Sequence, residues 1–139
     1  MEELIELKAH IEQQDYDKAL LLIDEMEEMA KDDKLHKIRS YAIVLLLHLI
    51  KRQAEQRTTK SWEISIQNAI EEIKYTNQRR KAKGQYINED ELKEVLENAF
   101  DSALRRASNE AFEGVFTDKE LAQKIEKQAV LSEAISFLI

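Results

Sequence analysis

The most constraining feature of this sequence is the run 41–50, in which nine of the ten residues are apolar and only His48 is polar. The run lies inside a longer pattern of helical periodicity. A helix that is apolar on most sides must be covered on most sides. Crossing a membrane would need about 20 apolar residues, and this run is about half that length. We therefore expect it to form the central helix of a bundle that is not associated with a membrane.

The rest of the chain favours helix throughout. Its 139 residues include no proline and only two glycines, Gly84 and Gly114, so few residues interrupt a helix. Periodicity and capping signals predict helices at about 2–13, 16–31, 33–57, 62–80, 89–112 and 118–137. A chain of this length suits one domain. We predict an all-α fold, a single-domain bundle over 1–139 of about five to six helices around the long helix at 33–57.

Polar residues predict where three of these helices begin. Asp32 and Asp33 carry carboxylates, which favour a helix N-terminus, so we place a break between the second and third helices there. The segment 88–91 is close to a capping box, and 117–120 is a complete one. These signals place the starts of the last two helices, which we predict at 89–112 and 118–137.

Cysteine is absent from the sequence, which excludes disulfides, thiolate metal ligands and cysteine nucleophiles. The first residues are acidic and lack the basic segment of a secretion signal. A chain without disulfides suits a reducing compartment. We therefore expect a cytoplasmic protein.

The net charge of −7 is unevenly distributed along the chain. Residues 1–34 hold 12 acidic and 4 basic side chains, which gives −8, whereas residues 51–83 hold 9 basic and 4 acidic ones, which gives +5. One interpretation is that these regions complement each other and are otherwise solvated. The alternative is that the basic region forms a modest anion-binding face.

No residue pattern predicts an enzyme, a metal site or a cofactor. The sequence has no histidine cluster and neither a His-x-x-x-His nor a Glu-x-x-His spacing. Glycine-rich phosphate loops, nucleophile elbows and paired-carboxylate signatures are also missing. We therefore expect no catalytic residues, no metal ligands and no cofactor.

The middle and second half of the chain carry a more specific pattern. It consists of 45–51, 61–62, 86–87 and 99–110, together with Arg57 and Ile66. In these residues the chain resembles the domain of unknown function numbered 29, a family abundant in cyanobacteria, over roughly 4–116. The resemblance implies a small all-α fold and no established activity. The last segment departs from the family, because a helix-like run from Thr117 replaces a short tail containing proline and cysteine.

His48 and Trp62 lie where this resemblance is strongest. A functional interpretation makes His48 a proton carrier, an anion ligand or a metal ligand. The alternative is a buried or half-buried histidine whose partner is a carboxylate or a backbone carbonyl. If 33–57 and 62–80 form an antiparallel hairpin, His48 and Trp62 are about 12 Å apart along it. We therefore expect Trp62 to cover the end of the long helix, and any partners of His48 to come from helices outside this hairpin.

Lys51 and Arg57 complete the set of candidate functional residues with His48 and Trp62. A nucleic-acid-associated or regulatory factor would use the basic ends of the hairpin, with Arg52, Arg57 and Lys60 as phosphate contacts. However, the hairpin places the other basic segment, 79–83, at the opposite end, and few aromatic residues are available to stack on bases. Nucleic-acid binding is therefore the alternative rather than the leading hypothesis.

The chain ends on an unusually apolar segment, 135–139. This segment either docks on the bundle or packs against another subunit, and Phe137, Leu138 and Ile139 are the candidate interface residues. With no catalytic pattern in the chain, it favours a non-enzymatic helical module that self-associates or binds another protein. An enzyme centred on His48 is the least favoured hypothesis.

Overall fold

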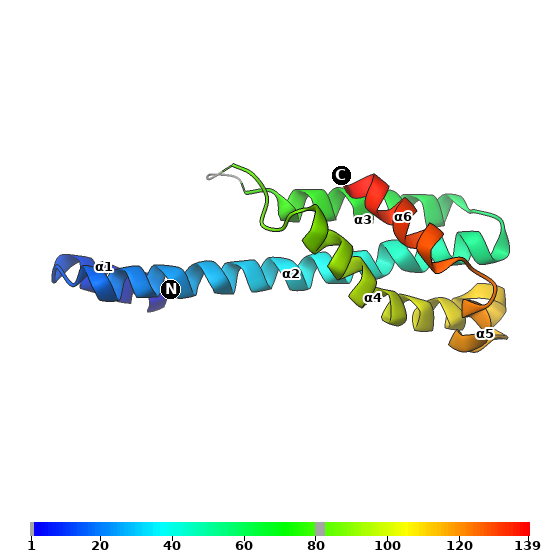
Figure 1. Ribbon diagram of the computed structural model, residues 1–139, viewed down its shortest axis with the longest axis horizontal. Helices are drawn as coiled ribbons and strands as arrows, with labels where there is room; N and C mark the ends of the chain where they lie inside the picture. Colours follow the sequence, from blue (N-terminus) through cyan, green and yellow to red (C-terminus); the bar gives the residue numbers. More distant parts are fainter. Residues whose placement is uncertain (1, 80–82) are drawn as a thin grey trace. The chain divides into compact units, whose positions relative to one another are not determined.

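A computed structural model describes residues 2–79 and 83–139, and helices make up almost all of the regular structure in those ranges. The elements are α1 (Glu2–Glu12), α2 (Tyr16–Glu55), α3 (Lys60–Asn77), α4 (Glu89–Glu110), the 3-10 turn η1 (Ala111–Gly114), α5 (Asp118–Ala122) and α6 (Lys127–Leu138) (Figure 1). The described residues also contain an isolated bridge between Gln78 and Gln85. The predicted all-α bundle around a long helix is confirmed.

The chain divides into two compact units, 1–35 and 36–139, with the boundary inside α2. This division follows the position of the core residues, and the single domain over 1–139 remains a prediction from the sequence. Among the described residues, the first unit buries only Ala19 and Leu22, and all other buried apolar side chains belong to the second unit.

The predicted break between the second and third helices does not form, and α2 runs without interruption from Tyr16 to Glu55. A carboxylate at a helix N-terminus contributes only about 0.3–1 kcal/mol. Neither glycine nor proline stands near Asp32 and Asp33 to stop the helix, and both side chains are exposed, where they can remain solvated within it.

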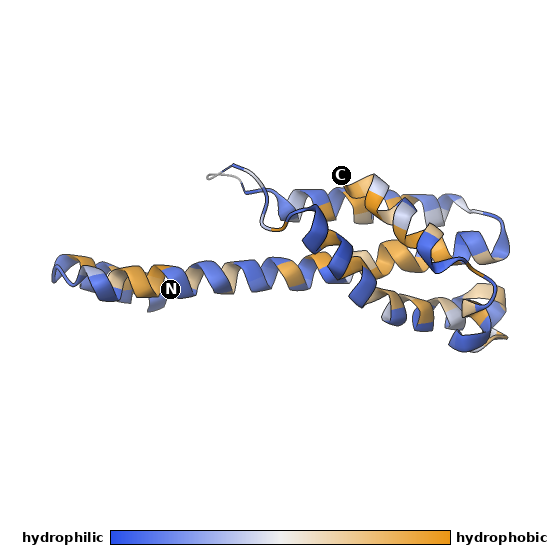
Figure 2. Cartoon of the chain, in the orientation of Figure 1, coloured by the Kyte–Doolittle hydropathy of each residue, from blue (hydrophilic) through white to orange (hydrophobic). Residues whose placement is uncertain are grey.

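The core of the second unit is built on the apolar run of α2. Leu45, Leu46 and Ile50 are fully buried there, and Figure 2 shows the apolar residues of this helix between those of the neighbouring helices. On α4, three alanines spaced by four residues (99, 103 and 107) are also fully buried. Because an alanine side chain is small, this stripe lets other helices approach α4 closely.

A buried asparagine fixes the connection between α3 and α4. The Asn77 side chain donates to the Ile87 carbonyl at 3.0 Å and accepts from the Ile87 backbone N–H at 2.9 Å. The α3 helix begins at Lys60 and ends at Asn77, whereas the sequence predicted 62–80, and residues 80–82 lie outside the described ranges. At the start of α4 the predicted capping signal forms as a full capping box between Asn88 and Glu91.

The predicted continuous helix at 118–137 is divided into α5 and α6. Its capping box at Thr117 forms as predicted, but the helix stops at Ala122 and begins again at Lys127. Leu121 and Val130 are both buried, although nine residues of continuous helix would turn them to opposite sides. The break allows both to face the core, and the Gln53 side chain of α2 accepts the Glu126 backbone N–H at 2.6 Å inside it.

In the first unit, a tight turn joins α1 to α2. Gln14 has a left-handed backbone with φ of 61°, and its N–H bonds to the Ile11 carbonyl while the Asp15 N–H bonds to the His10 carbonyl. This is the Schellman arrangement, which usually places glycine at the left-handed position. We refer to residues 2–35 as the N-terminal hairpin. Among the described residues of the whole chain, no helix is both long enough and apolar enough to span a membrane.

Candidate functional site

Two cationic side chains meet on the single tryptophan of the chain. The Lys51 Nζ lies 4.6 Å from the centroid of the Trp62 ring, and the Arg57 Cζ lies 4.7 Å from it. Trp62 is positioned by the N-cap of α3, where the Thr59 hydroxyl accepts its backbone N–H at 3.0 Å. A cation over an indole face contributes about 0.5–2 kcal/mol, more where water is excluded.

Lys51 is the most unusual member of this cluster, because it carries a charge and yet the residue is only 5% exposed. Its Nζ donates to Glu110 Oε1 at 3.2 Å, across 59 positions of sequence. A buried ammonium without a partner would carry a large desolvation cost. Glu110, at the end of α4, and the indole ring of Trp62 offset that cost.

His48 lies one turn before Lys51 on α2 and is half-buried. Burial lowers the pKa of His48, the Lys51 ammonium lowers it further, and the Glu110 carboxylate acts in the opposite direction. The Nδ1 atom of His48 is buried and has no hydrogen-bond partner. The environment therefore favours the neutral imidazole and leaves one of its polar atoms unsatisfied.

The structure brings together the four residues proposed from the sequence in a way that hairpin geometry alone did not predict. Lys51 contacts Trp62 and acts electrostatically on His48, so it links the two. The Glu110 carboxylate, which raises the pKa of His48, is on α4, a helix outside the predicted hairpin. The surroundings of the cluster are close to electrically balanced, since Glu110 pairs with Lys51 and Glu55 with Arg57 at 3.1 Å.

Another basic residue at this end of the bundle, Arg52, is also engaged. The Arg52 guanidinium donates to Glu63 at 3.0 Å and pairs with Glu133 of α6. The Thr58 hydroxyl and then Arg52 hold the pKa of Glu63 below its usual value. Of the three residues predicted as phosphate contacts, Arg52 and Arg57 are thus paired with carboxylates, and Lys60 is exposed.

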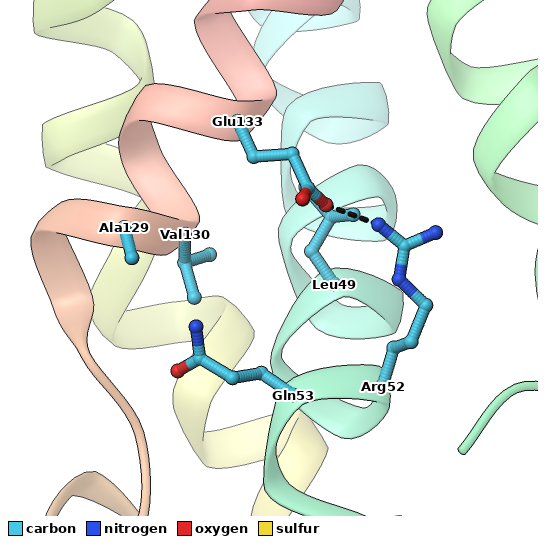
Figure 3. A pocket seen from close by; sticks show the side chains of 6 residues that line it. All are labelled: Leu49, Arg52, Gln53, Ala129, Val130 and Glu133. Atoms are coloured by element: carbon cyan, nitrogen blue, oxygen red, sulfur yellow. Dashed lines mark hydrogen bonds and ion pairs between the residues drawn. The ribbon is translucent and has the colours of Figure 1, made fainter. Parts of the chain in front are cut away.

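Figure 3 shows a pocket of about 210 Å³ where α2 meets α6. Its lining consists of Leu49, Arg52, Gln53, Ala129, Val130 and Glu133. The two charged side chains are paired with each other, and Gln53 accepts the Glu126 N–H. The polar groups of this pocket therefore hold α6 in place and leave no uncompensated charge for a ligand.

The C-terminal candidate residues have three different environments. Leu138 is buried in the second unit, with 5% of its surface exposed, Phe137 is half-buried, and Ile139 is 65% exposed. The segment 135–139 therefore docks on the bundle through Leu138. Most of the apolar surface that the sequence offered here for an interface is already covered.

The functional interpretation of the sequence missed the acidic partners of the cluster. Glu110, Glu63 and Glu133 stand 59, 11 and 81 positions from the bases they pair with. No local pattern connects residues so far apart, and each of these glutamates resembles an ordinary solvated side chain in the sequence. Among the described residues, no group of three or more histidine and acidic side chains could hold a metal ion.

Comparison with known proteins gives one match. Residues 3–131 match the family model described as domain of unknown function DUF29, which extends beyond the range 4–116 suggested by the sequence pattern. No curated protein and no solved structure matches the chain. The family match covers most of the chain, so the resemblance is confirmed and the protein belongs to the DUF29 family.

Proposed function

We propose that this protein is a non-enzymatic interaction module that binds another protein through its N-terminal hairpin. The single observation that carries the proposal is the exposure of the hairpin's apolar side chains. Seven of its large apolar residues are 49–69% exposed. They are Leu4, Ile5, Ile11, Tyr16, Leu20, Leu21 and Met29.

The hairpin contains little that would stabilise it by itself. None of the α1 residues is buried, and in the α2 part only Ala19 and Leu22 are. Units below about 40 residues usually need a disulfide, a metal or association with another chain to be stable. The sequence has no cysteine for a disulfide, and the described residues hold no group of three or more potential metal ligands, so this composition favours association as the source of stability.

The exposed residues also contribute binding energy toward a partner. Burying the remaining surface of a half-exposed leucine or isoleucine contributes about 1 kcal/mol, and association costs about 4–15 kcal/mol. Several such anchors acting together can offset that cost. The rest of the described chain has four exposed large apolar residues: Ile64 and Tyr75, eleven residues apart on α3, and Val115 and Ile139, which lie outside the helices.

Site-specific photo-crosslinking in cells of the source organism tests the proposal. A photoreactive residue is placed at Ile5, Leu20 or Leu21, and at Ile64 as a matched control, because Ile64 is an exposed isoleucine of the second unit. We expect protein adducts from the hairpin positions that are absent from the control. Crosslinks only to residues 36–139 of the same chain, or no adducts at all, would overturn the proposal.

A further inference from the structure

The most exposed leucines of the hairpin stand next to each other on the outer face of α2. Leu20 and Leu21 are 60% and 64% exposed. At 100° per residue, they lie on the face of the helix opposite the buried pair Ala19 and Leu22. A partner that covers these leucines would therefore leave the existing core of the hairpin undisturbed.

Acidic side chains border this pair of leucines. Asp17 and Asp24 stand three or four residues from both leucines, and side chains at that spacing are neighbours on a helix surface. Glu28 follows one turn after Asp24. All three carboxylates are exposed. Lys18, three residues from Leu21, pairs with Asp15, so the outer face of α2 presents an apolar centre with a mainly negative border.

A second copy of the chain is a poor occupant of this face. A symmetric dimer would place the same surface against itself. Residues 1–34 have 12 acidic and 4 basic side chains, so two segments of charge −8 would be brought together. A head-to-tail contact would need the chain's own bases, and three of the basic side chains at the end of the bundle, Lys51, Arg52 and Arg57, are already paired with carboxylates.

We propose that the occupant is a basic amphipathic helix of another protein, an inference that rests on the proposed function. Its apolar stripe covers Leu20 and Leu21, and its flanking lysines or arginines face Asp17, Asp24 and Glu28. In such recognition of an amphipathic helix, apolar anchors supply affinity and complementary charges supply selectivity.

The test measures binding of three fluorescent peptides to the full-length protein by anisotropy. The first is an amphipathic helix of about 18 residues with leucines on one face and lysines or arginines beside them, long enough to cover about five turns. The second carries glutamates at the basic positions. The third has the composition of the first in an order that destroys the apolar stripe.

We expect the basic amphipathic peptide to bind at least about tenfold more tightly than either of the others, and more weakly as salt is raised. Replacing both leucines, Leu20→Ser and Leu21→Ser, should reduce its affinity at least about tenfold, since both anchors are lost. The control Ile64→Ser should leave it unchanged. Circular dichroism confirms that the variants remain folded.

Equal binding of the basic and acidic peptides would overturn the proposal that the partner is basic. Equal binding of the third peptide, which lacks the apolar stripe, would overturn the proposal that the partner binds as an amphipathic helix. An equal loss of affinity in Ile64→Ser would overturn the location. If photo-crosslinking gives partner adducts while no basic peptide binds, the proposed function stands and this partner class is rejected. If both fail, the hairpin is not a binding surface.

Discussion

At the scale of single residues, His48 and Lys51 are two polar groups in a place that favours apolar ones. The buried charge of Lys51 is stabilised by two partners, the Glu110 carboxylate and the Trp62 ring. His48 has an unsatisfied Nδ1 and a pKa lowered mainly by burial. An unsatisfied buried polar atom costs about 1–3 kcal/mol, so the two residues differ in what their replacement should do.

Replacing His48 by leucine should raise the free energy of unfolding by about 1 kcal/mol at pH 7.5, because the unsatisfied atom is removed. The gain should be larger at pH 5.5. The folded-state pKa of His48 lies below the ordinary 6.5, so as the pH falls through about 6.5 the unfolded chain binds a proton that the folded chain does not. Wild-type stability therefore decreases over that window, and His48→Leu lacks this contribution.

Denaturant unfolding at both pH values, followed by Trp62 fluorescence, measures the two differences. The variant His48→Gln serves as the control, since it removes the titration but retains a polar side chain. It should share the flatter pH dependence without the full gain at pH 7.5. A His48→Leu variant that is less stable than wild type would contradict the prediction and indicate that the imidazole makes a stabilising contact.

Removing the partner of Lys51 should have the opposite effect. Glu110→Gln leaves a buried ammonium without its carboxylate and should lower the free energy of unfolding by about 1 kcal/mol, a modest value because Glu110 is half-exposed. The double variant Lys51→Met with Glu110→Gln should recover part of the loss. The control is Glu89→Gln, which breaks the exposed pair of Glu89 with Lys93 and should cost at most about 0.5 kcal/mol. The free energy of unfolding is measured by circular dichroism. Equal losses in the two single variants would show that the burial of Lys51 does not strengthen its pair with Glu110.

At the scale of elements, the turn after α4 depends on one glycine. Phe112, Glu113 and Gly114 all have left-handed backbones, with φ of 51°, 57° and 77°. A Cβ added to Gly114 would lie 3.1 Å from the Asn109 carbonyl oxygen, whereas one added to Gly84, which has φ of 84°, would meet nothing within 4 Å. The two glycines therefore share a backbone requirement and differ only in the space around them.

Gly114→Ala should destabilise the protein by about 1–3 kcal/mol, because strain at a left-handed position is combined with a close contact to backbone. Gly84→Ala, the matched variant, should lose only about 1 kcal/mol from the backbone conformation. Thermal unfolding of both proteins measures the difference. A Gly84→Ala variant as unstable as Gly114→Ala would mean that the contact with Asn109 relaxes without cost.

At the scale of the whole molecule, α6 belongs to the core of the second unit. It packs against α4 and α3, and Val130, Ala134 and Leu138 are buried. The Arg52 pair with Glu133 and the Gln53 bond to Glu126 fix it to α2 as well. The C-terminal segment is thus held by apolar burial and by polar contacts, and its removal should weaken the bundle.

Deleting residues 134–139 should destabilise the second unit by several kcal/mol, since burial of Leu138 alone contributes about 1.5–3 kcal/mol. Hydrogen exchange should show loss of protection in peptides from α3 and α4. Deleting only Ile139, which is 65% exposed, is the control and should change nothing measurable. If removal of 134–139 left protection unchanged, the docking of Leu138 would not contribute to the core.

The sequence by itself determined the class of the fold and most of its local structure. The apolar run 41–50 required a central helix, and the signals at Asn88 and Thr117 produced the capping boxes they predicted. These features follow from interactions within one or two turns, which a local pattern contains completely. The helix start predicted at Asp32 and Asp33 does not form, because the weak preference of carboxylates for a helix N-terminus did not outweigh continuation of the helix.

Only the tertiary structure decided where the chain breaks and which charges meet. The helix predicted at 118–137 stops at Ala122 because both Leu121 and Val130 must face one core, a requirement that no local signal expresses. Burial of Lys51 depends on Glu110, 59 positions away in the sequence, which is brought beside it. Burial and ion pairing depend on partners that distant segments supply, so they are settled by packing rather than by the sequence around each residue.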